Sequence, residues 1–187
     1  MSGNRKLLYK ITLSAIFLAL ALVLPFLNLQ IPEISSILCL MHIPVILCGF
    51  ICGWPYGLIV GFTAPLLRSG LFGMPPLFPT ALSMAFELAT YGFASAIFYK
   101  IFPKKKGFIY LSLIIAMLIG RAVWGLSMFA CFGLDYSKFG INAFLSGAFI
   151  KAIPGIILLI VLIPGLIMIY DKIIDKSKEE HNGKRKK

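Results

Sequence analysis

The chain has 187 residues, of which 59% are hydrophobic and only 13% are charged, and its formal net charge at pH 7 is +11. Its mean hydropathy is +0.93. A soluble domain carries roughly 25% charged residues, so the polar surface that a water-soluble fold of this size needs is missing. The composition therefore excludes an ordinary soluble domain and predicts a single domain embedded in a membrane.

Six apolar runs approach the roughly 20 residues that a helix needs to cross a bilayer. They cover residues 11–27, 37–53, 56–72, 80–102, 108–134 and 143–170. Helix-breaking sequences separate the runs, among them GWPYG, GMPPLFPT and PKKKG. We therefore expect an all-α, integral membrane bundle of six transmembrane helices over residues 1–171, followed by a basic, solvated and partly disordered cytoplasmic tail over residues 172–187.

The basic residues predict the orientation of these spans. Most of the 18 lysines and arginines gather in the N-terminus, in the segment Lys100–Lys106 and in the tail, whereas the opposite side has only Lys138. Cytoplasmic loops carry the excess of lysine and arginine, so we expect both termini in the cytoplasm. The same distribution explains the net charge by topology, and no nucleic-acid partner is expected.

The four cysteines all fall in apolar segments and form no CxxC pair. A buried thiol in such a segment behaves as a small hydrophobe. We therefore expect no disulfide framework, no metal site and no cofactor bound by this chain.

Five ionisable side chains fall inside the predicted spans, where each costs about 2.5–3.5 kcal/mol at the bilayer centre unless it is paired or hydrated. They are His42, Arg68, Glu87, Arg121 and Lys151. In the predicted topology all five lie between the outer surface and the middle of the membrane. This one-sided distribution favours a pocket open to the outside over a path through the whole bilayer.

Helical spacing adds further residues to the predicted pocket. Glu87 and Tyr91 share one helix face, and Arg121 and Trp124 share another. Aromatic walls with a few charges are typical of small-molecule sites. The predicted substrate-binding residues are Glu87, Tyr91, Arg121, Trp124, Lys151, Asn142 and Met74. In the alternative that stays open, Glu87 only neutralises a basic residue and holds helices together.

Three further features complete the pattern. His42 is alone on an apolar face and is interpreted as a core histidine, and Arg68 is interpreted as reaching the membrane surface. Ala15 and Ala19 form a small-xxx-small pair, which allows another helix to approach closely.

With these residues placed, the chain resembles the substrate-binding S components of energy-coupling factor (ECF) vitamin transporters. The resemblance rests on the size, the six spans, the Ala15-xxx-Ala19 pair and the block from HIPVILCGFICGWPYG to GMPPL. It implies a bacterial, multi-pass plasma-membrane subunit that captures a vitamin or related micronutrient outside the cell. It also implies that Ala15 and Ala19 dock on a transmembrane coupling subunit, and that the loop LNLQIPEISS caps the pocket.

The resemblance also implies a division of labour. Transport needs the coupling subunit and a pair of ATPases, and the partners use the ATP because this chain has no Walker A loop. The chain itself is expected not to be an enzyme, since HExxH and GxSxG motifs are absent. The alternative is a small structural or assembly membrane protein, similar to a rod-shape factor, that binds no ligand.

The charges in the predicted pocket favour an anionic ligand. Arg68, Arg121 and Lys151 outnumber Glu87, and unpaired buried charge is expensive, so a carboxylate or phosphate would complete the set. Pantothenate is the leading candidate, and a neutral pyridine or pyrimidine vitamin is the runner-up. If Arg68 and Lys151 do not contribute, Arg121 and Glu87 cancel and the preference disappears.

Overall fold

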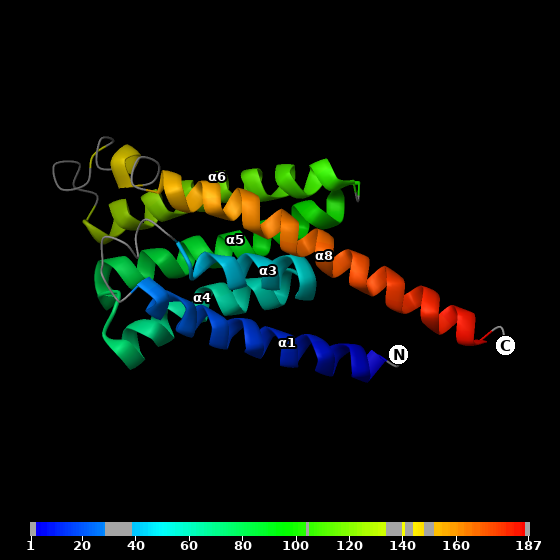
Figure 1. Ribbon diagram of the computed structural model, residues 1–187. Coiled ribbons are helices and arrows are strands. Elements are labelled where there is room, and N and C mark those ends of the chain that lie inside the picture. The colour runs from blue at the N-terminus through cyan, green and yellow to red at the C-terminus, as the bar shows by residue number, and fades with distance from the viewer. Residues whose placement is uncertain are drawn as a thin grey trace.

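The computed structural model describes residues 3–28, 39–103, 105–133, 140, 144–147 and 152–185, and within these residues it is all-helical (Figure 1). Two short helical segments, η1 and η2, extend longer helices. The elements in chain order are α1 (Gly3–Val23), η1 (Leu24–Asn28), α3 (His42–Cys52), α4 (Trp54–Phe72), η2 (Leu77–Ala81), α5 (Leu82–Ile101), α6 (Lys106–Cys131) and α8 (Ile153–Arg185).

Among the residues that the structure describes, four segments are long and apolar enough to cross a membrane. They are Gly3–Leu27, Leu77–Ile101, Gly107–Cys131 and Ile153–Ile173. Helix α3 has 11 residues, which at about 1.5 Å per residue is well short of the roughly 30 Å hydrocarbon core. Helix α4 has 19 residues, but its proline, glycine and arginine residues lower its hydropathy. The structure thus supports four of the six predicted spans by length and composition.

Helix α5 is the centre of the bundle. It packs against α3, α4 and α6, while α1 packs against α3 and α4, and α8 packs against α3 and α6. Several α5 side chains are completely buried, including Leu88 and Tyr91. A polar residue on the inner face of α5 therefore meets the other helices and not lipid.

Glycines permit this close packing. The chain turns at Gly53, whose φ of 103° lies in the left-handed region that favours glycine, and α4 folds back along α3. A Cβ atom on Gly57 would lie 2.6 Å from the carbonyl oxygen of Gly92 and 2.7 Å from Cα of Gly49. Helices α3, α4 and α5 therefore touch backbone to backbone along a seam made of Gly49, Gly57 and Gly92.

One end of the bundle carries both termini and the connection between α5 and α6 (Figure 1). There the hydroxyl of Tyr99 on α5 donates a hydrogen bond of 2.9 Å to Oδ2 of Asp171 on α8. Helix α8 does not stop at the predicted boundary of the tail after residue 171. It continues to Arg185, so the segment expected to be partly disordered is helical over most of its length.

Candidate functional site

A buried ion pair joins two of the central helices. Nη1 of Arg121 on α6 lies 3.0 Å from Oε1 of Glu87 on α5. The residues are only 7% and 2% exposed, respectively. Removing either charge from water is expensive, and the close approach of the opposite charge offsets much of that cost here.

Tyr91 adds a hydrogen bond to the same carboxylate. It lies one helical turn after Glu87, and its hydroxyl donates to Oε1 of Glu87 at 2.8 Å. A side chain at Gly120 on α6 would overlap the ring of Tyr91. The glycine therefore gives the tyrosine the space that brings its hydroxyl to the carboxylate.

His42 and Cys39 complete the group from a third element. Nε2 of His42, at the start of α3, lies 3.8 Å from Oε1 of Glu87, which is longer than a hydrogen bond. Nη2 of Arg121 donates to Sγ of Cys39 at 3.7 Å. These four contacts, Arg121–Glu87, Tyr91–Glu87, His42–Glu87 and Arg121–Cys39, lie in the interior between α3, α5 and α6. We refer to Cys39, His42, Glu87, Tyr91 and Arg121 as the Glu87 cluster.

Three buried polar atoms of the Glu87 cluster lack hydrogen bonds. Within the part of the chain that the structure describes, no group bonds to Nδ1 or Nε2 of His42 or to Nε of Arg121. A buried polar group without a partner costs about 1–3 kcal/mol, and the great majority of such groups in proteins are paired. A ligand or another polar group within reach would satisfy these atoms.

The structure brings together three of the seven predicted site residues, Glu87, Tyr91 and Arg121. Trp124 lies one turn further along α6 and stacks on Phe144, with ring centroids 6.4 Å apart. Met74 is 41% exposed in the connection between α4 and η2, whereas the Glu87 cluster is buried. Lys151 and Asn142 lie outside the described residues.

Arg68 is buried away from the predicted pocket. Its Nη1 donates to the carbonyl oxygen of Leu22 at 2.6 Å, and its guanidinium lies 4.8 Å from the ring centroid of Phe26 and 5.6 Å from that of Phe72. Arg68 thus fastens the end of α1 to α4. The sequence-based interpretation of Arg68 as a residue that reaches the membrane surface was wrong, because Arg68 is only 4% exposed. Its partners, a backbone carbonyl and two aromatic rings, give it a structural role, so the charge balance that favoured an anion loses this residue.

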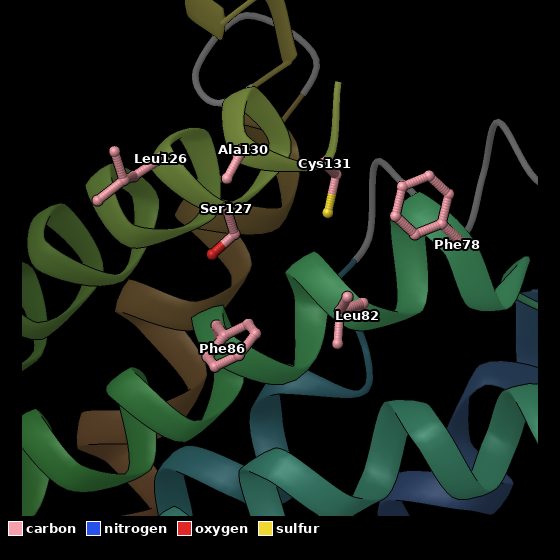
Figure 2. A pocket seen from close by; sticks show the side chains of 7 residues that line it. All are labelled: Phe78, Leu82, Phe86, Leu126, Ser127, Ala130 and Cys131. Carbon is pink, nitrogen blue, oxygen red and sulfur yellow. The ribbon is translucent and has the colours of Figure 1, made fainter. Parts of the chain in front are cut away.

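An apolar cavity of about 520 Å³ lies between the start of α5 and the end of α6 (Figure 2). The picture shows the hydroxyl of Ser127 directed into the space between the two helices. The cavity shares no residue with the Glu87 cluster, and the contact of 3.9 Å between Ser83 Oγ and Cys131 Sγ lies beside it. Its lining residues are Phe78, Leu82, Phe86, Leu126, Ser127, Ala130 and Cys131.

The sequence-based interpretation missed two members of the Glu87 cluster. His42 was interpreted as a core histidine, although its predicted depth matched that of Glu87 and Arg121. This shared depth was the signal that could have assigned it to the same site. For Cys39 the sequence offers no comparable signal, because a cysteine in an apolar run is usually a packing residue.

A model of the family described as "ECF transporter, substrate-specific component" matches residues 9–170. The chain belongs to this family. ECF substrate-specific components are subunits of transporters and not enzymes, and they work with a coupling and ATPase module. Together with the four apolar helices, this makes the chain a multi-pass membrane protein that serves as a substrate-binding transporter subunit. No curated protein and no solved structure matches the chain significantly.

We expect the ion pair of this S component to be strongly coupled. Glu87→Gln or Arg121→Gln alone leaves one charge uncompensated in the interior, and each should lower the free energy of unfolding by about 3–5 kcal/mol. The double variant should lose clearly less than the sum of the two. Unfolding of the purified chain in detergent measures this cycle, with the exposed Lys100→Gln as control. Additive losses, or single losses no larger than that of the control, would contradict the coupling.

Proposed function

We propose that this S component captures a vitamin or a related small micronutrient from outside the cell and delivers it inward together with a coupling subunit and two ATPases. The observation that carries the proposal is the Glu87 cluster. Ionisable groups within the membrane are costly and usually functional. Here His42, Glu87 and Arg121 come from three different helices and lie together. Among the described residues, nitrogen atoms of His42 and Arg121 have no hydrogen-bond partner, and a few convergent polar groups of this kind fix the orientation of a small ligand. In this proposal the ATP is used by the partners.

We further propose six transmembrane segments with both termini in the cytoplasm of a bacterial cell. In this arrangement α3 and α4, with the residues that flank them, supply the two spans beyond the four candidates. The placement of both termini and the α5–α6 connection at one end of the bundle supports it (Figure 1). That end carries the basic segments, which favour the cytoplasmic side.

Cysteine labelling tests this orientation directly. A cysteine at position 138 should react with a membrane-impermeant thiol reagent added to intact cells, and a cysteine at position 105 should react only after the cells are opened. The unsubstituted chain gives the background from its native cysteines, of which Cys39, Cys48 and Cys52 are buried and Cys131 is half-buried. The reverse labelling pattern would contradict the topology.

The docking of the coupling subunit is assigned to α1. Ala15 and Ala19 are exposed on this helix, opposite the side that buries Ser14, Phe17 and Ala21 against the bundle. Two small residues one turn apart allow the close approach of another membrane helix. The exposed position of both alanines supports a contact with a partner subunit over packing within this chain.

We expect Ala15→Trp or Ala19→Trp to abolish uptake while the isolated chain still binds its substrate. The bulky ring prevents close approach of the partner helix but lies on the exposed side of α1, whereas the Glu87 cluster is buried. Leu118→Trp is the control, because it places the same ring on another exposed position. Uptake by cells and thermal stabilisation of the purified variants by substrate measure the two effects. Normal uptake with either alanine variant would argue against docking on this face.

A further inference from the structure

The end of the bundle that carries both termini and the α5–α6 connection also carries exposed cations on several helices. We propose that this end binds the headgroups of anionic phospholipids, while apolar residues next to its cations lie against the acyl chains. The inference goes beyond the proposed function and does not depend on the substrate. We call this surface the basic end; its described, exposed cations are Arg5, Lys6, Lys10, Lys100, Lys105, Lys172 and Lys176.

Acidic residues are scarce at the basic end. Residues 1–10 and 100–107 contain no aspartate or glutamate. In α8 the first acid is Asp171, and its carboxylate accepts the hydrogen bond of Tyr99 at 2.9 Å. The remaining acids, Asp175, Glu179 and Glu180, follow beyond the candidate span Ile153–Ile173. A surface with this excess of positive charge at the ends of membrane helices attracts anionic lipids.

Exposed cations on three helices are each followed by an exposed apolar side chain. The pairs are Lys6 with Leu7 on α1, Lys100 with Ile101 on α5, and Lys172 with Ile173 on α8. The apolar members are 52%, 68% and 62% exposed, respectively. A free anion such as phosphate gains nothing from apolar surface, whereas a phospholipid carries a charged headgroup and acyl chains in one molecule. The pairs therefore favour a lipid over a soluble anion.

The cations lie on more than one flank of the bundle. Helix α1 packs against α3 and α4, whereas α6 packs against α5 and α8, and Figure 1 shows α1 and α6 along opposite edges. The cations of α1 and those of the α5–α6 connection are therefore on different flanks. A protein subunit that docks on one flank leaves the other uncovered, but lipid surrounds the whole bundle. The distribution thus favours lipid over an acidic protein partner.

Aromatic residues accompany the cations. Trp54 begins α4 at the basic end; half of its surface is exposed, and its ring lies edge-on to Phe93 with centroids 5.8 Å apart. Nζ of Lys10 lies 4.0 Å from the position that a Cβ atom on Gly53 would take, and 5.9 Å from the ring centroid of Tyr56. Tryptophan and tyrosine are enriched at the level of the lipid headgroups. Trp54 is therefore a fluorescent reporter beside a cation of the proposed surface.

Quenching of tryptophan fluorescence by brominated lipids tests the inference. The chain has two tryptophans, so Trp124→Phe leaves only Trp54. We reconstitute this variant in vesicles of equal amounts of phosphatidylglycerol and phosphatidylcholine, with one of the two brominated. From the attraction of a single nearby cation, we expect Trp54 to report a preference of about fivefold for phosphatidylglycerol, and high salt should weaken it. Equal quenching by the two lipids at low salt would overturn the inference.

The other tryptophan is the matched control. Trp54→Phe leaves Trp124, which lies near the far end of α6 from the α5–α6 connection. Both brominated lipids should quench Trp124 alike. A preference for phosphatidylglycerol as strong as that at Trp54 would overturn the assignment to the basic end.

Substitutions on α1 test the cations themselves. Lys6→Gln with Lys10→Gln should reduce the preference at Trp54 to about twofold or less, whereas Lys6→Arg with Lys10→Arg keeps the charge and should retain it. An unchanged preference after the glutamine substitutions would overturn the role of these lysines.

The unsubstituted chain gives an independent measurement should a tryptophan variant not fold. Its unfolding temperature in neutral detergent should rise more with dioctanoyl phosphatidylglycerol than with dioctanoyl phosphatidylcholine or with glycerol 3-phosphate, because only the first combines an anionic headgroup with acyl chains. Equal stabilisation by the two lipids, or as much by glycerol 3-phosphate as by phosphatidylglycerol, would overturn the inference. None of these results bears on the Glu87 cluster, so the proposed function stands or falls separately.

Discussion

An ion pair in the interior of the helical bundle is the constraint on which the rest of this structure depends. Glu87 and Arg121 lie 3.0 Å apart on the neighbouring helices α5 and α6, and removing one of the two charges would leave the other uncompensated in the interior. The pair holds α5 against α6 and draws the Tyr91 hydroxyl to the same oxygen. A carboxylate already engaged in this way orients the side chains around it.

The glycine seam makes that arrangement possible. Because Gly49, Gly57 and Gly92 carry no side chains, α3 and α4 lie directly on the backbone of α5. This close contact carries His42, at the start of α3, to within 3.8 Å of Glu87. A wider spacing between these helices would separate the histidine from the carboxylate, and the cluster would reduce to a plain ion pair. The packing of small residues and the chemistry of the site are therefore linked.

Much of the fold follows from the sequence, because hydrophobic runs and breakers mark helices without reference to their neighbours. Each predicted run overlaps a described helix, and the pairing of Glu87 with a basic residue was among the alternatives left open. The incorrect predictions concern contacts between residues on different helices. Counting along a helix gives the depth of Arg68 but not that its partner is Leu22 on another helix, and the same limit hid the convergence of His42 on Glu87. The continuation of α8 to Arg185 was missed because a highly charged segment is equally compatible with an irregular tail and with a solvent-exposed helix.

A structure of the purified S component with its bound substrate tests the central claim most directly. The account predicts a small molecule in contact with residues of the Glu87 cluster, with the Glu87–Arg121 pair intact. A substrate seated instead in the apolar cavity between α5 and α6 (Figure 2), with no contact to the Glu87 cluster, would contradict it.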